Sequence, residues 1–378
     1  MKVLHINTER TWRGGEQQVL YLMRGLDKRG VDQELLCRPD SAIAQRAREA
    51  GLTVWERPLR GELDLPAAMA IKSAIREKGF DVVHMHTSHA HTLGVIGSVL
   101  VGKDRPVTVV SRRVDFSIHK RRFSLSGIKY SKGVDRILCV SEAIRRVLLE
   151  DGLSPDALGV VHSGVDLLRF ENLPDNVADL REELRIPTDA PWIGNVAHCA
   201  DHKGQRYLVA AAPALLERHP NARITIVGDG ELLPELKSQA LELGVADSVT
   251  FPGFRTDVVE LLGAFDVFCF PSHLEGLGTS VLDAMGMRLP IVATTAGGIP
   301  EMIDSGTHGL LVPPKDPAAL TDALAWMLEH KDEAATMAAA GRARLEAEFT
   351  VEATVEKTLV EYEALLAARE EAAPQGNG

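Results

Sequence analysis

Short apolar runs rich in β-branched residues alternate with segments whose apolar residues recur at helical spacing along most of the chain. The first run, residues 3–6, is followed by a glycine-containing loop and then by Val19, Leu22, Met23 and Leu26, which share one face of a helix. Repeated strand and helix units of this kind are typical of a mostly parallel sheet covered by helices. The pattern therefore predicts an α/β protein.

These units form two series, which predict two domains. In the first series, strands are expected at residues 3–6, 81–86, 108–111, 137–140 and 159–162. In the second series, they are expected at residues 192–196, 223–227, 249–251, 267–270 and 291–294. The intervening stretch is rich in Pro, Asp and Asn, as interdomain linkers often are. We predict an N-terminal domain over residues 1–170, a linker over 171–190 and a C-terminal domain over 191–350.

A further helical pattern follows the second series. Val351, Val355, Leu359, Tyr362 and Leu366 recur at helical spacing, which predicts a helix over residues 351–371. We expect this helix to pack back on the first domain. Residues 372–378 are expected to be a disordered tail.

The composition agrees with two soluble domains. The 378 residues amount to about 2.5 times a typical domain of roughly 150. The longest apolar run, residues 92–102, has 11 residues, whereas a membrane-spanning helix needs ~20. The chain start lacks the pattern of a secretory signal, and the four cysteines form no CxxC pair. We therefore expect a cytoplasmic protein without a zinc site or a disulfide framework.

The most informative motif spans residues 271–286, which follow an expected buried strand and open a helix. Gly276 and Gly278 allow backbone amides to approach a ligand, and a helix that begins near Thr279 presents unpaired N–H groups to an anion. The motif predicts a phosphate site. On its own, it is equally compatible with a tight structural loop.

Two carboxylates, Glu275 and Asp283, flank this expected phosphate site. Together with the segments at residues 292–301 and 309–314, the motif resembles the family-4 glycosyltransferases, retaining enzymes of the GT-B fold that use nucleotide-sugar donors. The resemblance covers nearly the whole chain. It implies two doubly wound Rossmann-like domains that face a central cleft, with ligands at the carboxyl ends of both sheets.

The resemblance also implies roles at the donor site. Glu275 would hold hydroxyl groups of the donor sugar. The loop of Gly276, Leu277 and Gly278 would contact the sugar, and Thr279 would contact the distal phosphate. The second acid of the family motif binds the nucleotide ribose and is normally Glu, whereas this chain has Asp283, which is one methylene shorter.

Three further segments of the second domain match the family. Lys203 stands at the position of the lysine that receives the diphosphate, and His198 stands where an arginine is usual. Gly228 lies in a matching glycine pair that alone is also compatible with a turn. Phe254 and Arg255 occupy the place where the family holds the base.

In the first domain, Gly14 and Gly15 follow the first strand, where a glycine pair permits close approach to the donor phosphate or forms a plain turn. Residues 84–91 contain four of the thirteen histidines. His86 and His89 are expected to face the donor, as the resemblance implies an active-site histidine here. His84 and His91, which also lie in this stretch, are expected in core or surface roles. We predict no metal site, because no second cluster of acids or cysteines is evident.

A local basic segment interrupts an acidic chain whose net charge is −11. Residues 103–136 contain ten Lys or Arg and three Asp. Its candidate acceptor or membrane residues are Arg112, Arg113, Lys120, Arg121 and Arg122. Three interpretations remain open: a solvated face, a site for an anionic acceptor, and a patch on acidic lipid. The lipid interpretation would place the protein peripherally at the inner face of the membrane, and the overall charge argues against nucleic acid as a partner.

We therefore predict a retaining, metal-independent hexosyltransferase or related glycosyltransferase without a cofactor, which moves a sugar from a nucleotide-diphosphate sugar to an acceptor hydroxyl. The candidate catalytic residues are His86, His89, Lys203 and Glu275. The chain has no DxD motif, which disfavours a metal-dependent transferase. Acceptors would be glycans, lipid-linked saccharides or small molecules in cell-envelope or glycoconjugate synthesis. The alternatives are a nucleotide-sugar epimerase of similar fold and a non-catalytic protein that binds sugar nucleotides or glycans.

Overall fold

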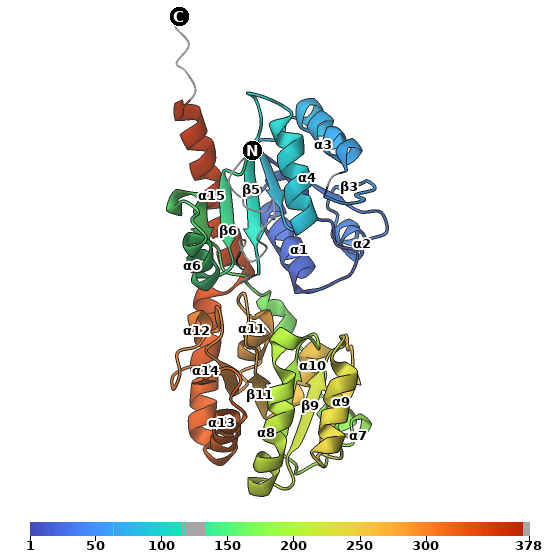
Figure 1. The fold of residues 1–378 in the computed structure, drawn as a ribbon, viewed down its shortest axis with the longest axis vertical. Helices are drawn as coiled ribbons and strands as arrows, with labels where there is room; N and C mark the ends of the chain where they lie inside the picture. Colours follow the sequence, from blue (N-terminus) through green and yellow to red (C-terminus); the bar gives the residue numbers. More distant parts are fainter. Residues whose placement is uncertain (63, 115–116, 118–132, 373–378) are drawn as a thin grey trace, which may run out of the picture. The chain divides into compact units, whose positions relative to one another are not determined.

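The computed structural model of the chain describes all residues except 63, 115–116, 118–132 and 373–378. It divides into two compact units (Figure 1). Unit 1 combines Met1–Gly164 with the C-terminal segment from Val351, and unit 2 is Val165–Thr350. Among the described residues, no helix combines the length and the apolar character needed to cross a bilayer.

The described part of unit 1 contains a parallel sheet with the strand order β3-β2-β1-β4-β5-β6-β7. Its strands are β1 (Lys2–Ile6), β2 (Asp32–Cys37), β3 (Val54–Glu56), β4 (Val82–Met85), β5 (Val107–Arg112), β6 (Arg136–Cys139) and β7 (Leu158–Val160). The sequence pattern did not predict β2 and β3. Strand β2 begins with polar residues, and the structure buries two of them: Gln33 donates to the Met23 carbonyl at 2.6 Å, and Glu34 pairs with Lys78 at 2.5 Å.

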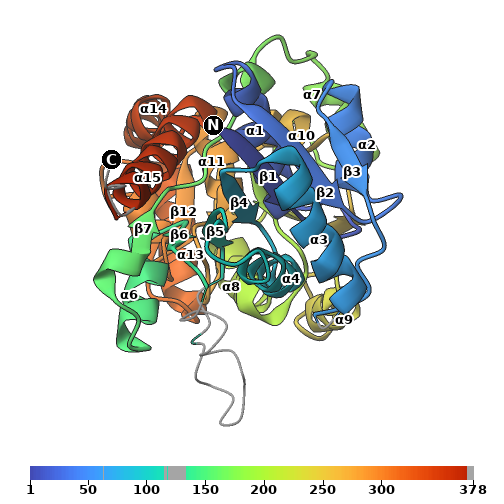
Figure 2. The ribbon, with the colours of Figure 1, turned by 90° about the horizontal axis from the view of Figure 1, so that it is seen from above.

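Helices cover this sheet (Figures 1 and 2). They are α1 (Gly14–Asp27), α2 (Ala42–Glu49), α3 (Leu65–Lys78), α4 (Ser88–Val99), α6 (Glu142–Glu150) and α15 (Val351–Ala372). Helix α15 packs on α1, where Gly25 leaves room for the side chain of Val355. Val355 and Tyr362 are fully buried in a cluster with Val3, and this burial ties the last helix to the first strand.

Unit 2 contains a second parallel sheet, with the strand order β10-β9-β8-β11-β12-β13. Its strands are β8 (Trp192–Val196), β9 (Arg223–Val227), β10 (Val249–Gly253), β11 (Val267–Phe270), β12 (Ile291–Thr294) and β13 (Leu310–Val312). Its helices are α7 (Val177–Glu183), α8 (Gln205–Arg218), α9 (Leu233–Glu242), α10 (Val258–Ala264), α11 (Thr279–Gly286), α12 (Ile299–Met302), α13 (Pro317–Glu329) and α14 (Lys331–Glu348). The three-residue strand β13 was not predicted, and α7 lies within the stretch expected to be a linker.

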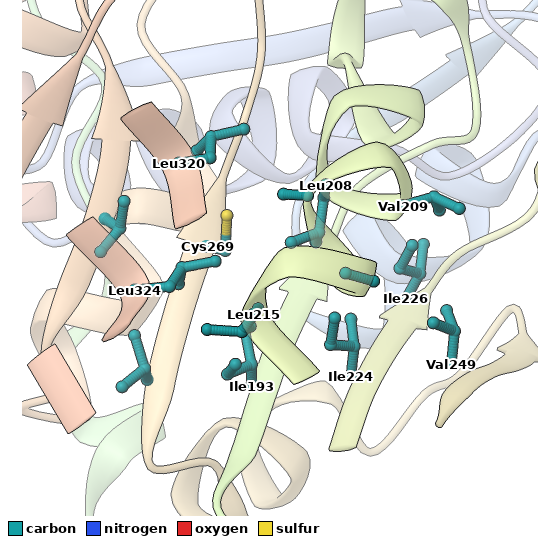
Figure 3. Packing of buried hydrophobic residues seen from close by; sticks show 14 of the residues in the cluster. Ile193, Leu208, Val209, Leu215, Ile224, Ile226, Val249, Cys269, Leu320 and Leu324 are labelled. Atoms are coloured by element: carbon teal, nitrogen blue, oxygen red, sulfur yellow. The ribbon is translucent and has the colours of Figure 1, made fainter. Parts of the chain in front are cut away.

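A continuous apolar core joins the strands of unit 2 to helices α8 and α13. Figure 3 shows Leu215 of α8 beside Ile193 and Ile224 of the sheet, and Leu324 of α13 near Cys269. All five side chains are buried. Because both faces of a parallel sheet are covered, its strands are apolar almost throughout, which is why most of them were visible in the sequence.

Each sheet reverses its strand order once. In unit 1, β1 pairs with β2 on one side and β4 on the other, and in unit 2, β8 pairs with β9 on one side and β11 on the other. Open parallel sheets bind ligands at the carboxyl ends of the strands that flank such a switch point. The loops after β1 and β4, and those after β8 and β11, are therefore the places where functional side chains are expected.

Candidate functional site

The switch point of unit 2 brings two of the predicted residues into contact. Lys203 follows β8, in the 3₁₀ helix η3 (Asp201–Lys203), and Glu275 follows β11. The Nζ atom of Lys203 lies 2.5 Å from Oε2 of Glu275, and the two side chains are 19% and 11% exposed. Ser272 donates to the same carboxylate oxygen at 3.4 Å. A paired cation and anion therefore stand at the carboxyl end of the sheet.

Backbone contacts hold the two loops together. The amide of His273 donates to the His202 carbonyl at 2.9 Å. Gly204 has a φ of 68°, and a Cβ there would lie 2.1 Å from the Pro271 carbonyl oxygen. Only glycine tolerates both the left-handed backbone and this close approach. The position of Lys203 is thus set by its own loop and by the loop that carries Glu275.

A third loop supports Glu275 from the side of β12. The amide of Gly298 donates to the Glu275 carbonyl at 3.3 Å. Gly297 has a φ of 53°, and a Cβ there would lie 1.7 Å from the same oxygen. The glycine pair within residues 292–301, recognised in the sequence only as a matching segment, therefore fixes the backbone of Glu275.

Helix α11 begins at Thr279, as the sequence predicted, directly after Gly278. The side chain of Leu277 is buried, so that only its backbone is available to a ligand. The backbone of residues 276–278 and the positive end of α11 adjoin the Lys203–Glu275 pair. An amide-lined helix start beside a lysine is suited to a phosphate group.

Asp283 lies one turn further along α11 and is largely buried. Its Oδ1 accepts a hydrogen bond from Nη1 of Arg169 at 2.9 Å. Burial raises the pKa of the Asp283 carboxyl, and the Arg169 guanidinium opposes that rise. Arg169 could not be predicted from the sequence, since no local motif links two residues that lie far apart in the chain.

The remaining candidates of unit 2 lie on the loops after β8, β9 and β10. Nε2 of His198 is 3.4 Å from Oε2 of Glu231. Gly228 packs directly against the backbone of residue 197. Arg255 forms ion pairs with Glu183 and Asp257, which raise its pKa. The two carboxylates hold the Arg255 head group between them.

Phe254, next to this ion-paired arginine, is 69% exposed. A ring that is so exposed at the carboxyl end of β10 is available for stacking on a planar group. Its neighbour Arg255 is held by carboxylates on α7 and at the start of α10. Of the two residues predicted to hold a base, the Phe254 ring is therefore exposed and the Arg255 guanidinium is fixed by ion pairs.

In unit 1, the predicted glycine pair opens helix α1 after β1. Glu16, which follows Gly14 and Gly15, accepts hydrogen bonds from the Arg13 amide at 3.1 Å and from Nδ2 of Asn7 at 3.4 Å. Burial raises the pKa of the Glu16 carboxyl. Asn7 and Glu16 were not predicted as site residues, and only the switch-point position of their loop points to them.

Arg113 lies just beyond β5 and close to this loop. Its Cδ is 3.8 Å from the place of a Cβ on Gly15, and its Nη1 donates to Ser163 at 3.4 Å. Burial lowers the pKa of Arg113 to about 10, and Glu16 opposes that shift. The guanidinium therefore stays charged at neutral pH. Arg112 ends β5, whereas Lys120, Arg121 and Arg122 lie outside the described residues.

The other side of this switch point carries a cluster of buried histidines. Nε2 of His86 is 3.0 Å from Nδ1 of His5, and His84 contacts the Tyr362 hydroxyl at 2.5 Å and the Ser111 hydroxyl at 2.7 Å. One ring nitrogen from each of the three histidines lies within 4.8 Å of the others, close enough for a shared metal ion. Four of their six ring nitrogens already take part in hydrogen bonds.

Burial determines the charge of this cluster. It lowers the pKa of His5 to about 3 and holds the pKa values of His84 and His86 well below the usual range. The cluster is therefore neutral at physiological pH. His89, the other histidine expected to face the donor, is exposed in the first turn of α4.

Two family models match the chain. The model described as Glycosyltransferase Family 4 matches residues 12–169, and the model described as Glycosyl transferases group 1 matches residues 176–344. Together they cover most of both units, including β4 and the whole sheet of unit 2.

Relatives with named activities align with just over half of this chain or with most of it. Over 219 residues the chain is 34% identical to a GDP-mannose-dependent alpha-(1-6)-phosphatidylinositol monomannoside mannosyltransferase of Mycobacterium tuberculosis. This match covers 56% of the chain and 57% of the relative, so it spans little more than half of that enzyme's length. A UDP-Gal:alpha-D-GlcNAc-diphosphoundecaprenol alpha-1,3-galactosyltransferase of Escherichia coli is 23% identical, with 88% of this chain and 89% of the relative covered.

Solved structures share the fold. Anabaena Alr3699/HepE in complex with UDP-glucose superposes with a TM-score of 0.84 at 23% identity, covering 96% of this chain and all of that one. Sucrose-phosphate synthase from Thermosynechococcus elongatus gives a TM-score of 0.78 at 20% identity and covers 97% of this chain and 99% of that one. The expected class, two Rossmann-like α/β domains of the GT-B type, is confirmed.

The buried histidines predict an acid-sensitive unit 1. An unfolded histidine takes up a proton near pH 6.5, whereas folded His5 does so only near pH 3. Below pH 6.5 the unfolded state thus binds more protons than the folded state. The free energy of unfolding therefore decreases as the pH is lowered, by up to about 1.4 kcal/mol per pH unit for each such histidine. Denaturant unfolding of the whole chain at pH 7.5, 6 and 5 measures this slope. His5→Gln is expected to reduce this slope by up to the contribution of one histidine. An unchanged slope in this variant would contradict the lowered pKa of His5.

Proposed function

We propose, since the chain belongs to the family-4 glycosyltransferases, that it moves a sugar from a nucleoside-diphosphate donor to an acceptor hydroxyl and retains the anomeric configuration. The observation that carries this proposal is the contact between Lys203 and Glu275 beside the start of helix α11. A lysine and helix amides suit a diphosphate, and a carboxylate suits sugar hydroxyls. The site thus offers complementary groups for both halves of a nucleotide sugar.

The leaving group is the chemical problem that this site would solve. When the bond between the anomeric carbon and the diphosphate breaks, negative charge develops on the phosphate oxygen. Lys203 and the amides at the start of α11 would stabilise that charge. In a front-face route, the same phosphate oxygen takes the proton of the acceptor hydroxyl, so the enzyme needs no nucleophile of its own.

The ion pair itself would take part in donor binding. A diphosphate beside Lys203 would compete with Glu275 for the ammonium group. The Glu275 oxygens would then be available to sugar hydroxyls, while the backbone contacts from residues 297 and 298 keep the residue in place. Phosphate binding and sugar binding would therefore reinforce each other.

On the acceptor side, we propose a glycolipid, lipid-linked saccharide or glycan, in cell-envelope or glycoconjugate synthesis. The named relatives act on a phosphatidylinositol mannoside and on a diphosphoundecaprenol-linked sugar, both of which carry phosphate. Arg113, charged and held beside the 14–15 glycine pair, is suited to an anionic group of such an acceptor. We propose that the protein works in the cytoplasm at the inner face of the membrane.

Transfer is expected not to depend on a divalent metal ion, because Lys203 and helix α11 supply the positive charge at the leaving group. An assay with GDP-mannose, UDP-galactose and UDP-glucose, in excess EDTA, should give the untreated rate. Loss of turnover in EDTA that Mg²⁺ or Mn²⁺ restores would refute this account. Epimerisation or hydrolysis of the donor without an acceptor would support an epimerase instead, and binding without turnover would support a non-catalytic protein.

Substitution of Glu275 is expected to lower kcat/KM, whereas substitution of Asp283 is expected to lower the affinity for the nucleotide. Glu275→Gln removes a charged acceptor for sugar hydroxyls, and a charge-assisted hydrogen bond is worth ~1.5 to 3 kcal/mol, so kcat/KM should fall by about 10 to 100-fold. The affinity of this variant for the free nucleoside diphosphate should not fall and is expected to rise, because the lost carboxylate no longer competes for Lys203. Asp283→Ala should instead weaken the nucleoside diphosphate itself. Calorimetry and initial rates on folded variants test this, and equal weakening of the bare nucleotide by both changes would contradict the division of roles.

Binding to acidic membranes is expected to depend on the basic segment over residues 103–136, since its charge would be attracted to anionic lipid and screened by salt. Sedimentation with phosphatidylglycerol vesicles should recover the protein at low ionic strength, with less recovery at high ionic strength and little with phosphatidylcholine. A variant with Lys120→Gln, Arg121→Gln and Arg122→Gln should lose recovery. Equal recovery of both proteins in all conditions leaves only a soluble anionic acceptor or a solvated face for this segment.

A further inference from the structure

Arg169 connects the first turn of unit 2 to the nucleotide side of the proposed donor site. It lies in the 3₁₀ helix η2 (Leu167–Phe170), and its guanidinium donates to Oδ1 of Asp283 at 2.9 Å. The two side chains are 27% and 17% exposed, so the pair is largely shielded from water but still accessible to a ligand. Among the described residues, Arg169 is the hydrogen-bond donor to the Asp283 carboxylate.

The backbone of Arg169 is held against the same helix by its neighbour. The ring of Phe170 occupies the space beside Gly286 of α11, where a Cβ would lie 2.4 Å from a ring carbon. Arg342 lies 5.7 Å from the centre of that ring and donates to the Gly286 carbonyl at 2.6 Å. The segment that carries Arg169 is therefore fixed to α11 at a second point, independently of Asp283.

Asp283 is a short acid with a cation, Arg169, directly beside it. Aspartate reaches one methylene less far than the glutamate that the family motif has at this position. A carboxylate on a short, largely buried side chain needs a partner to remain charged and to keep one orientation. The Arg169 guanidinium donates to Oδ1 of Asp283. This contact orients the carboxylate and leaves Oδ2 as a hydrogen-bond acceptor for a ligand.

We propose that Arg169 is a positioning residue that holds the Asp283 carboxylate for the ribose hydroxyls of the donor nucleotide. This inference rests on the proposed function, because it takes Asp283 as the ribose-binding acid. Arg169 itself need not touch the ligand. It keeps Asp283 ionised and oriented, so that the carboxylate accepts hydrogen bonds from the hydroxyls.

A comparison of ribose and deoxyribose ligands isolates this role. Calorimetry on the full chain with UDP and GDP, and with their 2′,3′-dideoxy counterparts, gives the preference of each variant for the ribose hydroxyls. The wild type is expected to prefer the ribose form by at least about tenfold, the effect of one charge-assisted hydrogen bond. Asp283→Asn should remove most of this preference.

Arg169→Gln is expected to lower the affinity for UDP or GDP by about tenfold and to leave the affinity for the dideoxy form within about twofold. Arg169→Lys keeps the charge and should restore most of the preference. The matched control is Arg342→Gln, which loosens the packing of Phe170 but leaves the Asp283 carboxylate untouched. It should lower the melting temperature and leave the preference for ribose unchanged.

The outcomes separate the inference from its premise. If the wild type binds neither nucleotide, or if Asp283→Asn keeps the preference, then the proposed function or the role of Asp283 fails, and the inference fails with it. If Asp283→Asn behaves as expected but Arg169→Gln keeps the wild-type preference, or weakens both ligand forms equally, only the positioning role is overturned. Circular dichroism and thermal melting confirm that each variant is folded.

Discussion

The switch of strand order beside β8 is the constraint on which the candidate site depends. Because β8 pairs with β9 on one side and β11 on the other, the loops after β8 and β11 must meet at one edge of the sheet. This topology brings together the loops of Lys203 and Glu275, which are 72 residues apart in the chain and whose side chains meet at 2.5 Å. The close backbone approaches at Gly204 and Gly297 then reduce the freedom of both loops, so that the charged pair sits on a rigid base.

The same topology in unit 1 leads to different chemistry. Strands β1 and β4, together with the segments that follow them, gather buried polar groups, and burial suppresses their charge: His5, His84 and His86 are held neutral, and the pKa of Glu16 is raised. Tyr362 reaches this cluster from the last helix, so α15 contributes to the environment of the histidines as well as to the apolar core. Because these histidines must stay neutral for unit 1 to remain folded, the stability of unit 1 is expected to decrease in acid.

Asp283 illustrates how a largely buried carboxylate can be accommodated. A carboxylate in a largely buried position would tend to take up a proton, and an adjacent guanidinium is the direct way to prevent this. The partner comes from η2, which the packing of Phe170 against Gly286 holds on α11. The segment η2 is thus attached to α11 in two ways, by the packing of Phe170 and by the ion pair of Arg169.

The sequence by itself determined the α/β class, most of the strands and the loops that follow them, since strands buried on both faces must be apolar and glycines mark close backbone approaches. It also identified Lys203, Glu275 and the start of α11 as candidates, because their motif is local. Only the tertiary structure decided that Lys203 pairs with Glu275, that polar residues open β2, and that Arg169 holds Asp283. These features depend on contacts between residues far apart in the chain, and the pairing order of the strands, which no local pattern encodes, sets those contacts.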